Sequence, residues 1–376
     1  MEFVLKQYDD ILLNFTAERT IDGIELSITS VNKDKVVQLP LGMETTDESL
    51  EYWLRHRTIP ANRAYAQNFL SKNGLNENDF IGILQICKGL SLTDCYWVTY
   101  PDDPKTFAQV NLFDNRFSRV LSQIAFTGYG SSPLSRFRSS PEFTTNGMLP
   151  KAWRRKEGAI LLYKGGTSGF ANTGKEPYSE FYAAQVAQAM GISHITYGLS
   201  KWKGQLCSTC ELFTSKDVSF VPASTLIGSS KISKIIDWYD AHGWKDDLAD
   251  MLVLDAVIRN TDRHLGNFGI LVDNHTNRLL KPAPIFDNGL SLYCYVMDDD
   301  LSNITEQEKT LTPALYADFD AVALRVMGAK QKQGLRHLLT FKFNKHSHYN
   351  LANKRLKMLE SAVQRKARYL LESVVL

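Results

Sequence analysis

The chain of 376 residues lacks the features that mark several classes of protein. Its five cysteines are an odd, sparse set that does not predict a disulfide framework. Cys207 and Cys210 form one CxxC pair, and no second pair completes a zinc site. No apolar run approaches the ~20 residues that span a bilayer, and the N-terminus does not resemble a signal peptide. These absences predict a soluble, reduced, cytoplasmic protein.

The sequence also lacks an excess of charge of either sign. The formal net charge is +2, so nothing global attracts the chain to nucleic acid or to an acidic membrane. We therefore expect no membrane association and no direct DNA binding. Hydrophobic residues make up 44% and charged residues 22%, which is ordinary for a globular protein.

The pattern along the chain predicts an α+β fold with two lobes. Residues 1–125 alternate strand-like runs, among them Val36–Leu39, with helical runs, and form an N-terminal α/β region. Residues 126–215 contain a loop rich in glycine, serine and proline and the buried strand Ala159–Lys164. Residues 216–376 are mainly helical. A cleft between two such lobes is a natural place for a ligand.

Three polar residues in the C-terminal half carry the strongest chemical signal. Asp262 and Asn267 lie five residues apart in RNTDRHLGN, and Asp287 follows in PIFDNG. The catalytic loop of protein kinases has the same interval between its aspartate and asparagine, and a later aspartate there binds magnesium. Phosphoryl transfer needs an acceptor held in line and metal ions that neutralise the phosphates. The apolar runs at 268–272 and 285–286 predict two short strands that place Asn267 and Asp287 side by side.

The simpler interpretation is that Asp262 caps a turn and Asn267 closes it, as these residue types often do. Three such residues at these intervals, with apolar runs beside them, favour the catalytic interpretation. Arg263 and His264 are then expected to support the loop.

A kinase site also needs a lysine on the phosphates, held by a glutamate from a helix. Lys164 ends the strand AILLYK, and Glu180 lies near the start of the following helix, which Pro177 and Gly191 bracket. A turn containing Gly147 and Lys151 precedes the strand and could cover the phosphates.

One other phosphate-binding pattern is present. Gly169–Lys175 fits G-x-x-x-x-G-K between a strand and a helix. The next residue is Glu176 where a serine or threonine would ligate magnesium, and its carboxylate would repel phosphate.

With these residues identified, the chain resembles the bacterial HipA-like serine/threonine protein kinases. The resemblance rests on NTDRH through Asn267, on Phe286-Asp287-Asn288-Gly289, and on Gly147 with Lys151-Ala152-Trp153. It implies a two-lobed kinase-like fold with ATP and Mg²⁺ in the cleft.

The resemblance also implies roles for residues and partners. Asp262 would be the catalytic base, Asn267 and Asp287 the magnesium ligands, and Lys164 an ATP contact, with the backbone from Glu211 to Phe213 holding adenine. Some members are toxins that phosphorylate an aminoacyl-tRNA synthetase and are restrained by a DNA-binding antitoxin. A protein substrate, such as a synthetase or a translation factor, is therefore expected. Autophosphorylation is expected at a residue before the glycine-containing loop, with the following candidates: Ser139, Ser140, Thr144 and Thr145.

Two alternatives stay open at this point. Phosphatidylinositol kinases use a similar D-R-H-x-x-N loop, although no amphipathic membrane-docking helix is evident. A catalytically inactive binding module is the other, and the full set of Lys164, Asp262, Asn267 and Asp287 argues against it. The sequence Asp287-Asn-Gly is also not D-F-G, so the packing switch of that phenylalanine is not expected.

Two charged stretches complete the pattern. Residues 330–368 carry eleven lysines or arginines against one acidic residue, Glu360. An RNA-contacting face is one interpretation, but Leu356, Leu359 and Val363 give a core-facing stripe, which favours a helix whose basic side is solvated. The acidic stretch 298–308 is expected to be a mobile, activation-type segment.

Overall fold

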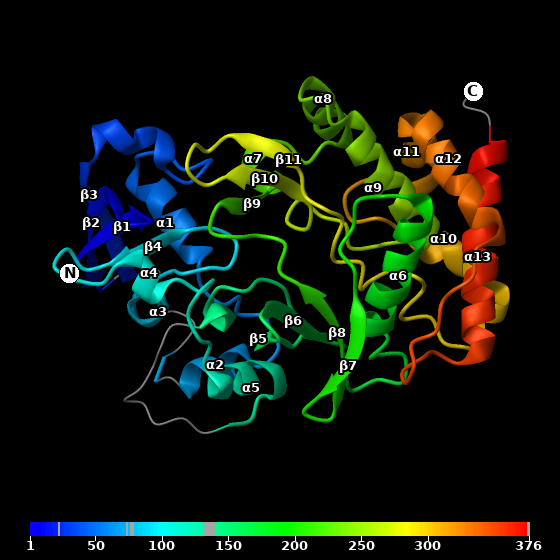
Figure 1. Cartoon of the computed structure of the whole chain (residues 1–376), viewed down its shortest axis with the longest axis horizontal. Helices are drawn as coiled ribbons and strands as arrows, with labels where there is room; N and C mark the ends of the chain where they lie inside the picture. Colours follow the sequence, from blue (N-terminus) through cyan, green and yellow to red (C-terminus); the bar gives the residue numbers. More distant parts are fainter. Residues whose placement is uncertain (22, 73, 76–78, 131–139, 374–376) are drawn as a thin grey trace. The chain divides into compact units, whose positions relative to one another are not determined.

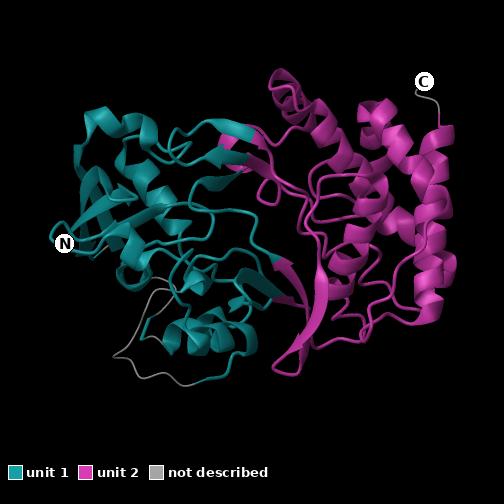
Figure 2. Cartoon of the chain, in the orientation of Figure 1, with its two compact units in different colours: residues 1–163, 211–221, 271–280 teal, residues 164–210, 222–270, 281–376 magenta. Residues whose placement is uncertain are grey.

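The computed structural model describes residues 1–21, 23–72, 74–75, 79–130 and 140–373. The chain forms two compact units, each built from separate stretches of sequence (Figure 2). Unit 1 comprises Met1–Tyr163, Glu211–Val221 and Leu271–Leu280. Unit 2 comprises the remaining segments, Lys164–Cys210, Pro222–Ile270 and Lys281–Leu376.

Unit 1 begins with an antiparallel sheet of strand order β3-β2-β1-β4 (Figure 1). Phe3 of β1 faces Phe15 of β2, and Leu5 lies opposite both Leu13 of β2 and Val98 of β4. These apolar side chains are buried and join the helices of the unit in one core. The elements of this part are β1 (Glu2–Gln7), β2 (Asp10–Thr20), β3 (Gly23–Val31), η1 (Lys33–Gln38), α1 (Asp47–Arg55), α2 (Ala66–Ser71), α3 (Phe80–Cys87), β4 (Tyr96–Thr99), α4 (Phe107–Val110), α5 (Arg119–Thr127), η3 (Pro141–Phe143) and β5 (Lys151–Lys156).

Two further sheets have the strand orders β5-β6-β8-β7 and β11-β10-β9. Their remaining strands are β6 (Ala159–Gly165), β7 (Gly198–Trp202), β8 (Gln205–Glu211), β9 (Val218–Pro222), β10 (Gly269–Asp273) and β11 (Leu279–Pro282). The boundaries between the two units fall within five of these strands.

Unit 2 is mainly helical and is organised around α9 (Lys245–Ile258). Every residue of α9 from Leu248 to Ile258 is buried, which explains why this stretch is apolar apart from Asp250 and Asp255. The helix packs against α6, α8, α11, α12 and α13. The other elements are α6 (Glu176–Met190), α7 (Ala223–Leu226), α8 (Ile232–Ala241), η4 (Asp300–Asn303), α10 (Ile304–Thr310), α11 (Phe319–Val326), α12 (Ala329–His337), η5 (Leu338–Thr340) and α13 (Asn353–Glu372).

The predicted α+β class, with a mixed first half and a mainly helical second half, is confirmed. The strand predicted at Ala159–Lys164 is β6, and the helix predicted to stop at Gly191 is α6, whose last turn ends there at φ 72°. The division at residues 125 and 215 stays a prediction.

Two local predictions are wrong. Val36–Leu39 lies mostly in the 3₁₀ helix η1, because Asn32 caps that turn by accepting a hydrogen bond from the Asp34 amide. Residues 285–286 form no strand, since Ile285 makes only an isolated bridge to His194. In the described part of the chain, no helix is both long enough and apolar enough to cross a bilayer.

Candidate active site

The end of β6 and the second turn of α6 bring a lysine and a glutamate together inside unit 2. Lys164 Nζ lies 2.7 Å from Glu180 Oε1, and both side chains are buried. The residues of β6 before Lys164 are apolar, and the strand becomes buried at its end, so the lysine side chain lies in the interior. The predicted pair is therefore present in the structure.

Asp287 completes this ion cluster. Its carboxylate is hydrogen-bonded to Lys164 Nζ, and its backbone is in the left-handed region at φ 57°, which is uncommon for a residue other than glycine. The Asp287 amide donates to the Tyr197 hydroxyl at 3.2 Å, and the next amide, of Asn288, donates to Glu180 Oε2 at 2.8 Å. Three hydrogen bonds thus hold the turn after Phe286 against Lys164, Tyr197 and Glu180.

The cluster shifts the pKa values of its members. Burial alone would lower the pKa of Lys164, but Asp287 and Glu180 outweigh it and raise that pKa, so the ammonium is charged at neutral pH. Burial raises the pKa of Glu180, and Lys164 opposes this shift. A single buried cation is shared by two carboxylates, an arrangement that leaves the local charge negative.

A buried arginine builds the loop that precedes β10. Arg263 is fully buried and makes a bidentate pair with Asp255 of α9, with both N–O distances at 2.9 Å. The same guanidinium donates to the Phe286 carbonyl at 2.8 Å and to Asn288 Oδ1 at 2.7 Å. One side chain therefore joins the loop around Asp262 to the turn that carries Asp287.

Asn267 closes the loop through its side-chain amide. Its Nδ2 donates to the Asp262 carbonyl at 2.8 Å, and its Oδ1 accepts from the His264 amide at 3.1 Å. Asn260 Oδ1 accepts from the Asp262 amide at 3.2 Å. The Asn267 side chain therefore closes the turn, as the simpler interpretation predicted. Its amide oxygen has two lone pairs, and one of them stays available for a further ligand.

The surroundings of Asp262 favour its protonated form. Burial and the nearby Asp287 carboxylate raise its pKa above the ordinary aspartate value, while His264 and Lys164 act in the opposite direction. The side chain is only half-buried, so it stays accessible to a reactant. A carboxylate of raised pKa accepts a proton more readily than an ordinary one.

The glycine-rich stretch between β6 and α6 is held by the carboxylate that follows it. Glu176 is buried, and its Oε1 accepts from the Thr167 amide at 3.2 Å and from the Tyr295 hydroxyl at 2.8 Å. Its Oε2 has no hydrogen-bond partner among the described residues and would lie 2.8 Å from a Cβ built on Gly166. A negative charge inside the loop disfavours phosphate there, so the G-x-x-x-x-G-K pattern is a poor phosphate site.

The other predicted site residues lie in unit 1. Gly147 has φ 93°, a backbone conformation that favours glycine, and a Cβ built on it would meet the end of the flexible Lys151 side chain. Lys151 Nζ donates to the Asn146 carbonyl at 2.8 Å. Glu211 is the last residue of β8, and Phe213 packs edge-on against Phe220 with ring centroids 5.7 Å apart.

The candidate phosphorylation sites differ in exposure. Ser139 lies outside the described residues. Ser140 is fully buried and donates a hydrogen bond to the Glu142 carboxylate. Thr144 is buried and donates to the Leu90 carbonyl at 2.8 Å, and Thr145 donates to the Pro141 carbonyl at 2.6 Å.

Sequence reasoning missed four residues that position the site. Asp255 is hidden in an apolar helix, and Tyr197 belongs to a segment without a motif. Asn260 lies two residues before Asp262, and Asn288 lies one residue after Asp287. These positions next to the predicted aspartates were the signal that could have identified them.

Comparison with known proteins finds sequence similarity to a kinase. No protein-family model matches it. The serine/threonine-protein kinase CtkA of Helicobacter pylori strain J99 is 28% identical over 213 residues, which are 51% of this chain and 61% of CtkA. The match thus spans about three-fifths of the relative's length.

Two solved structures are similar to the chain. The crystal structure of the H. pylori proinflammatory kinase CtkA aligns with a TM-score of 0.45 and 18% identity, over 58% of this chain and 90% of CtkA. HipA of Shewanella oneidensis MR-1, solved with HipB and operator DNA, aligns with a TM-score of 0.57 and 10% identity, over 99% of this chain and 100% of HipA. The chain is thus similar in sequence to CtkA over about half of its length and shares its fold with HipA.

Proposed function

We propose that the protein is a serine/threonine protein kinase of HipA-like type that uses ATP and Mg²⁺. The observation that carries the proposal is the ion cluster of buried Lys164 and Glu180 with the partly exposed Asp287, beside the loop of Asp262. A lysine held by a helix glutamate, a metal-binding aspartate and a base are the parts that phosphoryl transfer requires.

The residues present fit these cofactors. Mg²⁺ prefers one or two carboxylates with other oxygen ligands, and the Asp287 carboxylate and Asn267 Oδ1 are of that kind. ATP supplies the phosphoryl group, and the metal neutralises the charge on its phosphates. Lys164 would contact the phosphates, with the loop of Gly147 and Lys151 covering them and the backbone from Glu211 to Phe213 holding adenine.

The steps assigned to the chain follow from its geometry. Asp262 orients the acceptor hydroxyl and takes its proton, which its raised pKa favours. Arg263 acts as a positioning residue, since it ties the loop of Asp262 to the turn of Asp287. Glu180 keeps Lys164 in place by accepting its hydrogen bond.

The cellular partners are proposed from the relatives. HipA was solved with HipB and DNA, which supports a DNA-binding antitoxin as partner of this chain. A protein substrate in the cytoplasm, such as a translation factor or an aminoacyl-tRNA synthetase, completes the proposal, together with autophosphorylation between residues 139 and 145.

Intact mass spectrometry after incubation with Mg-ATP tests the activity. We expect the wild type to gain phosphate-sized increments and Asp287→Ala to gain none, because that carboxylate is the proposed metal ligand. Asp299→Ala is the matched control, since Asp299 is exposed on the same segment and should leave the gain unchanged.

The same gain in Asp287→Ala would contradict the assignment of the site. An unmodified wild type that also leaves added protein substrates unmodified would contradict protein kinase activity. Titration with ATP and incubation with phosphoinositide vesicles would then separate an inactive binding module from a lipid kinase.

A further inference from the structure

A second site lies in unit 2, at a pocket that none of the predicted catalytic residues lines. Its pocket has a volume of about 30 Å³ and is lined by residues of α8 and α9 and by the segments around Ile192, Phe268 and Ile285. A water needs about 10–15 Å³, so the pocket accepts the end of one side chain and excludes a nucleotide. No step of the proposed kinase reaction uses it.

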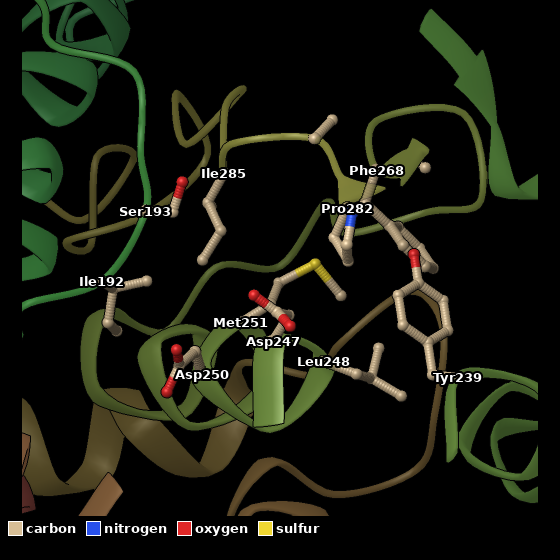
Figure 3. Close-up of a pocket in the computed structure, with 12 residues that line it drawn as sticks. Ile192, Ser193, Tyr239, Asp247, Leu248, Asp250, Met251, Phe268, Pro282 and Ile285 are labelled. Atoms are coloured by element: carbon tan, nitrogen blue, oxygen red, sulfur yellow. The ribbon is translucent and has the colours of Figure 1, made fainter. Parts of the chain in front are cut away.

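The wall of the pocket is mostly apolar. Figure 3 shows Ile192 and Ser193 on one side and Tyr239 on the other, with Met251 between them. Met251 and Ile285 are both buried. A wall of this composition suits a short hydrocarbon stem.

One carboxylate in this wall is only weakly compensated. Asp250 is already neutralised, since its oxygens accept from Lys330 Nζ at 2.7 Å and from Gln331 Nε2 at 2.8 Å. Asp247 is half-buried, and its carboxylate accepts a hydrogen bond from its own backbone amide. No ion pair with it, and no hydrogen bond to it from another side chain, is found among the described residues. Burial and the adjacent Asp250 raise the pKa of Asp247, although Lys330 acts in the opposite direction. An additional cation would therefore be stabilised at Asp247.

Aromatic rings continue from the end of α8 into the turn before α9. Tyr239 lines the pocket, and Trp238 packs edge-on against it with ring centroids 5.3 Å apart. His242 stacks on Trp238 at 4.0 Å and on Trp244 at 5.4 Å. Tyr239 is buried, whereas Trp238 and Trp244 are half-buried. The face of a partly accessible tryptophan ring attracts an ammonium group.

The charged residues around the pocket also favour a cationic ligand. α8 with its N-cap and the first two turns of α9 contain lysines at positions 231, 234 and 245. The same segments contain five aspartates: Asp237, Asp240, Asp246, Asp247 and Asp250. Lys245 is 3.3 Å from Asp240, and Lys330 of α12 pairs with Asp250. The excess of negative charge favours a cationic ligand.

We propose that this pocket binds the end of a lysine side chain presented by a protein partner. The stem lies against Met251 and Ile285, the ammonium pairs with Asp247, and the residues on either side of the lysine lie over Trp238 and Trp244. Lys330 on Asp250 already shows a lysine of this chain pairing with a carboxylate of the same helix. The site needs no ATP, so it can be tested whether or not the chain is a kinase.

NMR of the ¹³C-labelled methionine methyl groups tests the proposal without ATP. Met251→Leu assigns the Met251 signal among the eight methionines. The probes are n-butylammonium, which copies the lysine side chain, and the uncharged n-butanol, both at constant ionic strength. We expect a saturable shift of the Met251 methyl with n-butylammonium, with a Kd of about 1–10 mM, and a response to n-butanol at least about tenfold weaker.

Two variants separate the carboxylates. Asp247→Asn should weaken n-butylammonium binding about tenfold. Asp246→Asn, in the same first turn of α9 but exposed, should leave it within about twofold of the wild type. Unchanged signals from the other methionines identify variants that are folded.

A tripeptide with a central lysine should reproduce the shift, and the same peptide with norleucine should not. Equal responses to n-butylammonium and n-butanol would overturn the proposal, as would no saturable shift in the wild type. Undiminished binding to Asp247→Asn would also overturn it, and tighter binding of n-propylguanidinium would overturn the assignment to lysine.

Discussion

At the scale of single residues, the site is a set of charges that constrain one another. Lys164 is paired with two carboxylates, and a third, Asp262, lies close enough to Asp287 for its pKa to rise. The spacing of Asp262, Asn267 and Asp287 was visible in the sequence, but their protonation depends on burial and on neighbours from other elements.

The raised pKa of Asp262 leads to a prediction about pH. A base must be deprotonated to act, so activity is lost as the pH falls through the pKa of Asp262. Because burial raises that pKa, the acid limb of the pH–rate profile should lie above the ordinary value of 3.8. Initial rates of phosphate transfer measured across pH check this, and an acid limb at or below 3.8 would contradict it.

Asp262→Asn provides the matching variant. We expect its rate to fall by about 10²–10⁴-fold, the usual contribution of a general base. A raised pKa means that the folded state binds this proton more tightly than the unfolded state, so ionised Asp262 costs stability at neutral pH. The melting temperature of Asp262→Asn should therefore not fall, and a large loss of stability would indicate a structural role instead.

At the scale of elements, α13 holds the chain that follows Asp287. The predicted core-facing stripe is confirmed, because Leu356, Leu359, Val363 and Leu370 are buried. The basic side of the helix is only partly solvated, which corrects the expectation from the sequence: Arg355 and Lys366 are buried. Lys366 Nζ donates to Asp320 at 2.8 Å.

The acidic stretch 298–308 is folded into η4 and α10 and is bound by these cations. Glu308 accepts from the Tyr293 hydroxyl at 2.7 Å and pairs with Arg365 of α13. Asp298 pairs with Arg355 at 2.6 Å. An activation-type role for this segment stays a prediction.

Arg355 offers a test of this anchoring. Its guanidinium donates to the carbonyls of Tyr293 at 2.6 Å and Val296 at 2.9 Å. Arg355→Met keeps the length of the side chain and removes these bonds, each worth about 1.5–3 kcal/mol. We expect amide hydrogen exchange at residues 293–298 to quicken by about 10–100-fold, as that range implies.

Arg368→Met is the control, since Arg368 is exposed on the same helix. If amide exchange at residues 293–298 is equally slow in Arg355→Met and in the wild type, other contacts hold the segment.

At the scale of the whole molecule, each compact unit is assembled from distant stretches of chain. Strands β9 to β11 contribute to both units. Cutting the sequence into continuous segments therefore separates residues that belong to the same compact unit. The predicted boundary at residue 125 lies inside α5, whose Leu121 and Ile124 share the core of unit 1 with Phe143.

A fragment spanning residues 126–376 tests that boundary. Without the first turns of α5, Phe143 loses apolar partners, and burying a large apolar side chain is worth about 1.5–3 kcal/mol. We expect the fragment to melt without a cooperative transition by circular dichroism, in contrast to the full chain. A cooperative melt, with ATP affinity equal to that of the full chain, would support the predicted boundary.

The sequence by itself determined the features that depend on neighbours within about twenty residues. The apolar run of β6, the Pro177 and Gly191 bracket of α6 and the interval from Asp262 to Asn267 are local patterns, because a strand, a helix or a turn forms from adjacent residues.

Only the tertiary structure decided which of these elements meet. Arg263 with Asn288, Tyr197 with Asp287, and Asp250 with Lys330 each join elements whose pairing has no local signal. The physical reason is that burial and the sign of the surrounding charge arise from packing between distant segments, and those two quantities set both the pKa of Asp262 and the preference of the second pocket for a cation.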